Sequence, residues 1–339
     1  MTIEKKFKIL SIDGGGIRGI IPAKVLADLE ESLCNKNGRD TKLCEHFDLI
    51  CGTSTGAILA IAIALGIPAK KIVSLYKDNA EAIFPRWYLK ILPRKSRVLT
   101  TSIYSNKVLK RLLKQLFTEA NGGVTPLIND LKTKVCIPTY NGGMGEINIL
   151  KTKHCDEYNR DYKLPAHEVA LSSASAPVYF PPNSFTYDNE LGSGVNINMI
   201  DGGVFANNPT LIGIFEATDK LKVKFSDLQV LSLGTGRGRH IVKQSWKPQN
   251  FFYWFIPKPR LLDITLDSQA QITEQYIFFL RRTIADQNKA FDYLRVQHDF
   301  YSDSIDLNAS KKKDLMHLEA IGSELSKKYL TEILTLINK

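Results

Sequence analysis

The sequence predicts an α/β fold with a mostly parallel central sheet flanked by helices on both faces, a three-layer arrangement. Short apolar segments of strand length alternate with amphipathic segments of helical spacing along the chain. Two glycine-rich turns each follow one of the apolar segments directly. The composition, 44% hydrophobic and 24% charged, is ordinary for a globular protein that can form a sizeable core.

The N-terminal part of the chain contains strand-like segments at 7–12 and 47–51, and each of them ends at a glycine-rich turn. A helix is expected from about Pro22, because proline is tolerated in a first helical turn and apolar residues recur after it at helical spacing. An Ala/Ile/Leu-rich helix follows the second turn, and Pro68 opens another. Residues 84–104 then break the pattern with prolines and many basic and aromatic side chains.

The alternation of helices and strands continues to about residue 240. The expected elements are a helix at 106–117, strands at 134–140 and 147–151, a helix near 166–175, a strand at 198–201, a helix after Pro209 and a strand at 228–233. Beyond that point the pattern is less regular, and helices are expected at 263–285 and 311–337.

No internal repeat or linker divides the chain, so we expect a single domain over 1–339. Its motif-bearing core covers about 7–240, and the C-terminal extension, 241–339, is expected to pack on the core or cap it. The N-terminus lacks the apolar stretch of a signal peptide, and the most apolar segment, 57–67, is too short to span a bilayer. We therefore expect a cytoplasmic protein that contacts the inner membrane peripherally when active.

The five cysteines are odd in number and show no CxxC spacing, which suits a reducing compartment and argues against a structural zinc site. The histidines have no ligand spacing either, so we expect no metal. The formal net charge of +10 favours an anionic partner, either nucleic acid or an acidic membrane surface. The basic residues are spread along the chain, so a solvated surface explains them equally well.

The sequence Gly52-Thr53-Ser54-Thr55-Gly56 matches G-x-S-x-G between a predicted strand and a predicted helix. Gly52 and Gly56 allow the sharp turn that exposes the serine hydroxyl at its tip. The helix that follows places its N-terminal amides near developing negative charge. Because of this context, we predict that Ser54 is a nucleophile.

The sequence Asp13-Gly14-Gly15-Gly16-Ile17-Arg18-Gly19 follows the first strand directly. Successive glycines let backbone N–H groups converge on an anion, as an oxyanion hole requires. The stretch also satisfies G-x-G-x-x-G, the dinucleotide fingerprint, which needs a carboxylate at the end of a second strand about twenty residues on. Glu30 and Glu31 fall inside a helical pattern instead, which disfavours that alternative.

A third signal is Met199-Ile200-Asp201-Gly202-Gly203, where a carboxylate ends a strand before a glycine turn. Asp-Gly turns are common, so this signal is weak alone. Together with the two glycine-rich motifs, and in the same order, it resembles the patatin-like phospholipases. The resemblance extends over about residues 7–240 through further segments, Ser172-Ser173-Ala174-Ser175-Ala176-Pro177-Val178-Tyr179-Phe180-Pro181-Pro182, Asn207-Asn208-Pro209 and Leu231-Ser232-Leu233-Gly234-Thr235-Gly236.

The resemblance implies a patatin-like fold and a serine–aspartate dyad that cleaves fatty-acyl esters of membrane glycerophospholipids. Ser54 is then the nucleophile and Asp201 its base. The oxyanion hole is assigned to Gly14, Gly15 and Gly16 with Arg18 fixing the loop. An aspartate near its ordinary pKa of about 3.9 is a poor base at neutral pH, so the mechanism needs a desolvated Asp201. No cofactor is implied.

Other functions compatible with the same residues remain open. A Ser-His-Asp triad would use His240, which follows the 228–233 strand where an α/β-hydrolase carries its histidine. A binding module would use the glycine loops to hold a nucleotide without hydrolysis. Some compact bacterial proteins of the patatin-like family resemble antiviral effectors that cyclic dinucleotides switch on. An anionic activator of this kind would suit the basic charge, and such an effector would suit a homo-oligomer.

Two segments rich in aromatic and basic side chains could meet a bilayer, 83–95 and 251–258. Trp and Tyr suit the headgroup region, and Lys and Arg attract anionic lipids. A packed corner of the core or a self-association surface explains the same composition.

Overall fold

The structure is a computed structural model that describes residues 6–86, 102–189, 192–238, 253–254, 260–285, 290–301 and 304–338. Within these ranges no helix is both long enough and apolar enough to cross a membrane.

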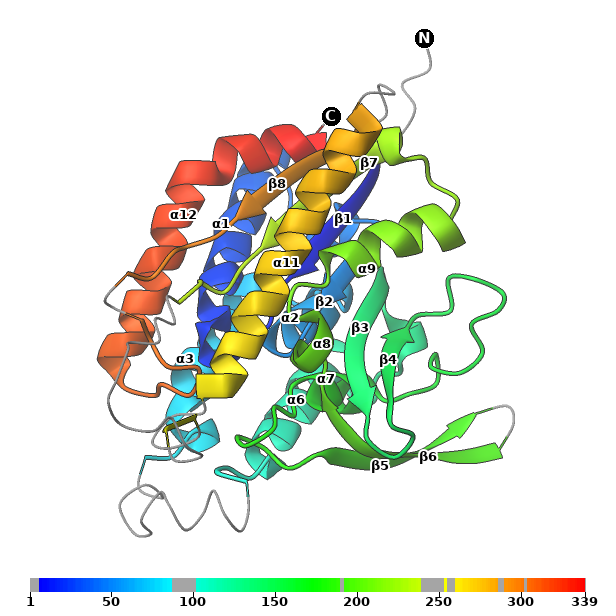
Figure 1. The fold of residues 1–339 in the computed structure, drawn as a ribbon, viewed down its shortest axis with the longest axis vertical. Coiled ribbons are helices and arrows are strands. Elements are labelled where there is room, and N and C mark those ends of the chain that lie inside the picture. Colours follow the sequence, from blue (N-terminus) through cyan, green and yellow to red (C-terminus); the bar gives the residue numbers. More distant parts are fainter. Residues whose placement is uncertain are drawn as a thin grey trace.

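The described strands form an eight-stranded sheet in the order β5-β6-β3-β2-β1-β7-β8, with β4 paired to β3 (Figure 1). The strands are β1 (Phe7–Ile12), β2 (Leu49–Gly52), β3 (Lys134–Asn141), β4 (Glu146–Lys151), β5 (Asn183–Asn189), β6 (Gly192–Asp201), β7 (Leu228–Leu233) and β8 (Asp292–Val296). The strands β3, β2, β1, β7 and β8 are parallel, whereas β4, β5 and β6 join by antiparallel pairing. The predicted mostly parallel sheet is confirmed.

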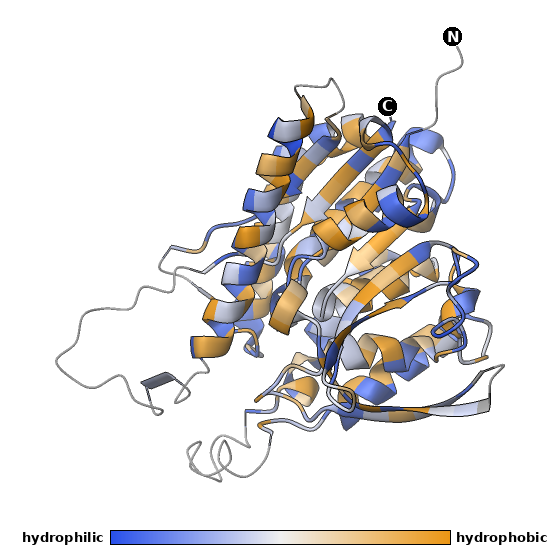
Figure 2. Ribbon diagram, turned by 45° about the vertical axis from the view of Figure 1, so that its right-hand side comes forward, coloured by the Kyte–Doolittle hydropathy of each residue, from blue (hydrophilic) through white to orange (hydrophobic). Residues whose placement is uncertain are grey.

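Helices cover both faces of the sheet. They are α1 (Ile20–Asn37), α2 (Thr55–Ala64), α3 (Ala69–Ile83), α6 (Lys107–Ala120), α7 (Ala166–Ser173), α8 (Gly203–Ala206), α9 (Thr210–Phe215), α11 (Arg260–Ala285) and α12 (Lys312–Asn338). Short helical turns are η1 (Gly16–Gly19), η2 (Leu43–Glu45), η3 (Ile128–Asp130), η4 (Glu216–Lys220) and η5 (Phe225–Asp227). The central strands β1, β2 and β7 are predominantly apolar, and the flanking helices alternate between apolar and hydrophilic turns (Figure 2).

The two faces of the sheet carry separate hydrophobic cores, because successive side chains of a strand point to opposite sides. Leu10 and Ile50 belong to the core formed with α1, α2, α3, α6, α7 and α12. Ile9 and Cys51 belong to the smaller core on the other face, which includes Ile214 of α9 and residues of α11. The three layers that the sequence predicted are thus present.

The C-terminal region departs most from the sequence prediction. The helices α11 and α12 lie where they were expected, but β8 was not predicted, and it pairs with β7 to extend the sheet. The antiparallel hairpin of β5 and β6 was predicted only at its last four residues. The assignment of one domain to 1–339 stays a prediction.

The parallel strands β1 and β2 are neighbours at the centre of the sheet, with Ile12 paired to Gly52. Since the carboxyl ends of parallel strands meet at one edge, the turns that follow them lie side by side. The strand β6 runs antiparallel to β3 and ends at Asp201, opposite Thr139. This topology brings the predicted motifs together.

Candidate active site

Ser54 occupies a sharp turn between β2 and α2. Its backbone has φ 57° and ψ −121°, a left-handed conformation that is unusual for a residue with a side chain. The flanking glycines are needed for space, since a Cβ on Gly52 would lie 2.1 Å from the Gly56 carbonyl oxygen. A Cβ on Gly56 would lie 2.2 Å from the carbonyl oxygen of Ile12. The turn therefore packs directly onto β1, with Ser54 at its tip.

The backbone of Ser54 is held by a serine of α7. The amide of Ser54 donates to Ser173 Oγ at 2.9 Å, and the Ser173 hydroxyl donates to the Pro138 carbonyl at 2.7 Å. Both interactions are buried. They fix the strained turn against β3, so that the side chain of Ser54 is positioned by elements distant in sequence.

Asp201 lines the same cavity as Ser54 and is only 3% exposed. Its Oδ1 accepts a hydrogen bond from the Gly203 amide at 2.7 Å, and its own amide donates to the Ser175 carbonyl at 3.1 Å. The Ser54 hydroxyl lies close enough to the carboxylate to lower its pKa by hydrogen bonding. The structure thus brings together the two side chains that the sequence singled out.

Burial raises the pKa of Asp201 to about 7, and the hydrogen bonds from Ser54 and Gly203 lower it only in part. A carboxylate that titrates near neutrality can accept a proton from a hydroxyl far better than an ordinary aspartate can. The pKa thus suits a general base.

The glycine loop after β1 lies beside Ser54. Gly15 and Gly16 line the cavity, and no hydrogen bond from either amide is found among the described residues. The Gly14 amide differs, because it donates to the Asn207 carbonyl at 2.9 Å. Gly14 is therefore not available as an oxyanion donor, which corrects its assignment: its role is to leave room, since a Cβ there would lie 2.3 Å from Asn207 Oδ1.

Arg18 is not among the residues that line the cavity. It is 6% exposed, its guanidinium carbon lies 6.0 Å from the centre of the Phe300 ring, and its amide donates to the Gly15 carbonyl at 3.1 Å. These contacts agree with a supporting role for Arg18 in the conformation of the loop.

Substitution of Gly16 by alanine is expected to disable the loop. Gly16 has φ +55°, and a Cβ there would lie 2.4 Å from the Leu307 carbonyl oxygen, so the loop must move. Displacing an oxyanion donor lowers kcat by about 10²-fold or more. Gly38→Ala is the matched control, since Gly38 has φ +63° and open space around it. Ester hydrolysis by both variants checks this, and equal activities would contradict it.

The loop is anchored by an ion pair that the sequence did not reveal. Arg295 of β8 donates from Nη1 to Asp13 Oδ1 at 2.9 Å and from Nη2 to Asp13 Oδ2 at 2.6 Å. Its Nη1 also donates to Ser232 Oγ at 2.9 Å, and its Nε to Glu274 Oε1 at 3.0 Å. Burial alone would lower the pKa of Arg295, but Asp13 raises it above its usual range. The pair therefore fixes the residue that precedes the glycines.

The cavity that holds Ser54 and Asp201 is small, about 40 Å³. Binding sites for small organic molecules typically measure about 300–1,000 Å³. Aromatic and aliphatic side chains also line the cavity, namely Phe84, Tyr179, Phe180, Leu266 and Leu307. Two of them, Leu266 and Leu307, come from the region beyond residue 240, so this region contributes to the wall of the cavity. Its predicted capping role stays a prediction.

None of the histidines in the described ranges lines the cavity. His240, the candidate for a catalytic triad, lies outside the described residues. The two segments predicted to meet a bilayer also lie largely outside them, with only 83–86 and 253–254 described.

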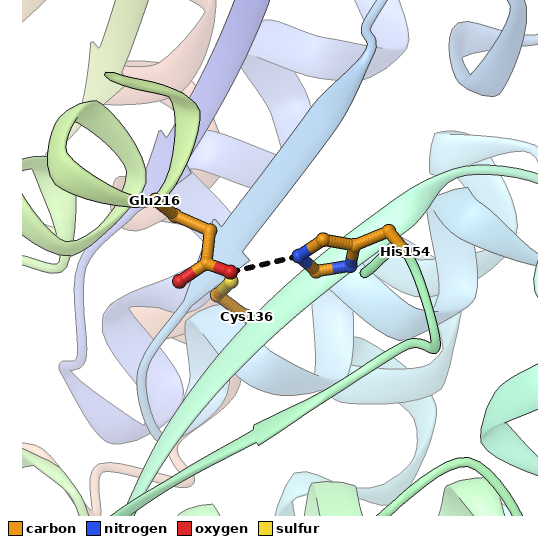
Figure 3. Close-up of side chains that lie close together, drawn as sticks. All are labelled: Cys136, His154 and Glu216. Carbon is orange, nitrogen blue, oxygen red and sulfur yellow. Dashed lines mark hydrogen bonds and ion pairs between the residues drawn. The ribbon is translucent and has the colours of Figure 1, made fainter. Parts of the chain in front are cut away.

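Cys136, His154 and Glu216 bring the donor types of a transition-metal site together on the smaller core's face (Figure 3). Their ligand atoms lie within 4.8 Å of one another. Glu216 is already engaged, because Lys151 Nζ lies 2.6 Å, Tyr158 Oη 2.6 Å and His154 Nε2 2.9 Å from its oxygens. Burial would raise the pKa of Glu216, but these hydrogen bonds outweigh it and lower the pKa to about 2. A cation would have to displace the ammonium of Lys151 from Glu216. We therefore interpret Cys136, His154 and Glu216 as part of a buried network of ion pairs and hydrogen bonds rather than as a metal site.

Comparison with known proteins gives a consistent result. A family model described as Patatin-like phospholipase matches residues 10–214. The chain is 30% identical over 347 residues to the cGAMP-activated phospholipase of Vibrio cholerae, covering 97% of this chain and 93% of that protein. It is 29% identical over 348 residues to Patatin-like protein 1 of Arabidopsis thaliana, covering 94% and 80%. It is 35% identical over 238 residues to the cGAMP-activated phospholipase of Escherichia coli, covering 68% and 63%.

Proposed function

The chain belongs to the patatin-like phospholipase family, and from that premise we propose that it cleaves fatty-acyl esters of membrane phospholipids with a Ser54–Asp201 dyad. The observation that carries the dyad is the shared cavity. In it, a serine held at φ 57° lies beside a buried carboxylate whose pKa is about 7.

The first half of the reaction acylates the enzyme. Ser54 Oγ attacks the ester carbonyl carbon while its proton passes to the Asp201 carboxylate. The carbonyl oxygen becomes negatively charged, and the amides of Gly15 and Gly16, which line the cavity, donate to it in this proposal. As the tetrahedral intermediate collapses, the ester bond breaks and Asp201 returns the proton to the leaving alcohol of the lysolipid.

The second half restores the enzyme. A water molecule gives a proton to Asp201 and attacks the acyl-serine carbonyl, again with charge on the oxygen at the glycine loop. Ser54 leaves with the proton from Asp201, and a free fatty acid is released. Asp201 thus accepts and returns one proton in each half of the reaction.

Lipid analysis tests this function. Purified protein incubated with phospholipid vesicles is expected to release free fatty acid and lysolipid in equal amounts, as measured by mass spectrometry. Ser54→Ala should release neither above background. Release by Ser54→Ala at the wild-type rate would show that another residue performs the reaction.

The rate should depend on the ionisation of Asp201. Because the pKa of this group is raised to about 7, the base is largely protonated at pH 6 and ionised at pH 8. We expect kcat/KM for a soluble ester to rise about tenfold per pH unit below pH 7 and to level off above it. Stopped assays between pH 5 and 9 check this, and a profile flat down to pH 5 would contradict it.

We further propose that the enzyme acts in the cytoplasm and contacts the inner membrane peripherally, since its substrate lies there. The net charge of +10 supports attraction to anionic lipids. Self-association of the protein is a separate proposal. It is supported by the exposed apolar side chains Ile272, Tyr276 and Phe279 on α11.

A nucleotide-controlled, antiviral role is a second proposal. Two of the relatives described above carry the name cGAMP-activated phospholipase. The small volume of the cavity, about 40 Å³, supports control by opening, because a phospholipid needs more room than this. An activator of this kind needs a second site that communicates with the cavity.

A further inference from the structure

Asn207 is a polar residue of the active-site cavity that the reaction described above does not use. It belongs to the segment Asn207-Asn208-Pro209, which follows α8 directly. Asn207 is 5% exposed and lines the cavity together with Ser54 and Asp201. A carboxamide at this position brings two N–H donors and one acceptor oxygen to the reacting groups.

The side-chain amide of Asn207 makes no hydrogen bond to any of the described residues. Of its two polar atoms, Oδ1 is sealed from solvent and Nδ2 is not. Two glycines leave room for the oxygen, because a Cβ on Gly14 would lie 2.3 Å from it and a Cβ on Gly203 would lie 3.2 Å from it. The amides of both glycines already donate elsewhere, to the Asn207 carbonyl and to Asp201 Oδ1. Buried polar side chains without partners are rare, which indicates that this amide binds a group of the substrate.

The backbone around Asn207 is fixed to both catalytic turns. The Ala206 carbonyl accepts a hydrogen bond from Thr53 Oγ1 at 2.7 Å, and Thr53 directly precedes Ser54. The Asn207 carbonyl accepts a hydrogen bond from the Gly14 amide at 2.9 Å. The side chain of Asn207 is therefore held beside the reacting groups before a substrate binds. Stabilisation of a transition state by hydrogen bonds requires donors that are positioned in advance in this way.

The oxyanion hole has one backbone donor fewer than the sequence predicted. The Gly14 amide is taken by the Asn207 carbonyl, which leaves the amides of Gly15 and Gly16. The side chain of the same asparagine lies close to the nucleophile. Asn207 Oδ1 and Ser54 Cβ lie 2.3 Å and 3.2 Å, respectively, from the position that a Cβ on Gly14 would take. Asparagine side chains are among the groups that donate in oxyanion holes.

We propose that Asn207 is a catalytic residue, whose Nδ2 donates a hydrogen bond to the oxyanion that forms when Ser54 attacks the ester. This inference rests on the proposed function, which supplies the reaction. Nδ2 takes the place of the donor that Gly14 does not provide. The hydrogen bond strengthens as negative charge develops on the carbonyl oxygen, so it lowers the barrier rather than raising the affinity for the substrate. Asn207 itself stays neutral throughout.

The variants Asn207→Ala and Asn207→Leu test this role. Alanine removes the amide, and leucine keeps the branched shape without a donor. For p-nitrophenyl butyrate, we expect kcat to fall about 10²-fold or more in both variants, with KM within about threefold of the wild-type value. Steady-state hydrolysis measures the two constants, and thermal melting verifies that the variants fold.

Asn208→Ala is the matched control. Asn208 is 2% exposed and does not line the cavity, and its Oδ1 accepts a hydrogen bond from the Thr210 amide at 3.0 Å. Its loss should lower the melting temperature more than Asn207→Ala does, because only Asn208 has a hydrogen bond to lose in the free protein. The kcat of Asn208→Ala should stay within about threefold of the wild-type value. Equal losses of kcat in Asn207→Ala and Asn208→Ala would overturn the proposal.

A trifluoromethyl ketone distinguishes a donor from a structural support. It adds to the hydroxyl of Ser54 as an anionic hemiketal and so occupies the oxyanion hole, whereas the corresponding alcohol cannot form this adduct. We expect the inhibition constant of the ketone to rise in the Asn207 variants by the same factor as kcat falls, and that of the alcohol to stay the same.

The remaining outcomes separate the alternatives. An unchanged inhibition constant for the ketone, with the midpoint of the pH–rate profile moved upward, would mean that the amide binds Asp201, and the proposal would be wrong. A wild type that hydrolyses the ester through Ser54, with Asn207 variants as active as wild type, would overturn this inference and leave the proposed function standing. A wild type that hydrolyses no ester would contradict the proposed function and this inference with it.

Discussion

Asp201→Asn is expected to lower kcat/KM for a soluble ester by about 10³-fold or more, because it removes the general base and keeps the shape of the side chain. Steady-state hydrolysis at pH 8 measures the loss. His240→Ala in the same assay should retain activity, since Asp201 already lies in the cavity with Ser54. An inactive His240→Ala with an active Asp201→Asn would reverse the assignment of the base.

The same substitution should not destabilise the protein. The folded-state pKa of Asp201 is about 7, above the value of about 3.9 in the unfolded chain, so the folded state holds the extra proton between these values. Stability then falls as pH rises from about 4 to 7, by a few kcal/mol in total. A neutral amide carries no such penalty, so Asp201→Asn should melt at or above the wild-type temperature at pH 8. Asp156→Asn, at an exposed position, is the control. If Asp201→Asn lost its activity because it unfolded, this would contradict the account.

Arg295→Met is expected to lower the free energy of unfolding by about 3–5 kcal/mol, because it leaves the buried carboxylate of Asp13 without its partner. Asp13 is 2% exposed, and the pair holds the start of the glycine loop. Hydrolysis should fall as well, through misplaced oxyanion donors. Urea unfolding and kcat measurements check the two effects.

The double variant Asp13→Asn/Arg295→Met separates the buried charge from lost packing. It should recover part of the stability, because no uncompensated charge is left. The exposed Arg282→Met should change the free energy of unfolding by less than about 0.5 kcal/mol. If Arg295→Met behaved like Arg282→Met, the ion pair would have no part in holding the loop.

The sequence predicted the parallel core of the fold well, because its signals are local. The turns at Gly52–Gly56 and at Gly14–Gly16 each follow an apolar strand, and parallel pairing of β1 and β2 brings them to one edge. Asp201 could be placed with them only through the family resemblance, since an Asp-Gly turn alone says little.

Long-range partners explain what the sequence missed. In the sequence, Gly14 cannot be told apart from Gly15 and Gly16. In the structure, its amide donates a hydrogen bond to the Asn207 carbonyl, which only folding brings close. The strand β8 carries Arg295 among apolar residues, and its alternation is too short to stand out. The contact between Arg295 and Asp13 spans 282 positions in the sequence. No local pattern encodes such a pair.

Covalent labelling of Ser54 with a fluorophosphonate probe tests the central claim most directly. The probe reacts with a serine hydroxyl only where a base and an oxyanion hole activate it. We expect a single adduct on the peptide containing Ser54, none on Ser54→Ala, and labelling slowed by about 10²-fold or more in Asp201→Asn. An adduct on another serine, or an Asp201→Asn variant that labels at the wild-type rate, would contradict the account.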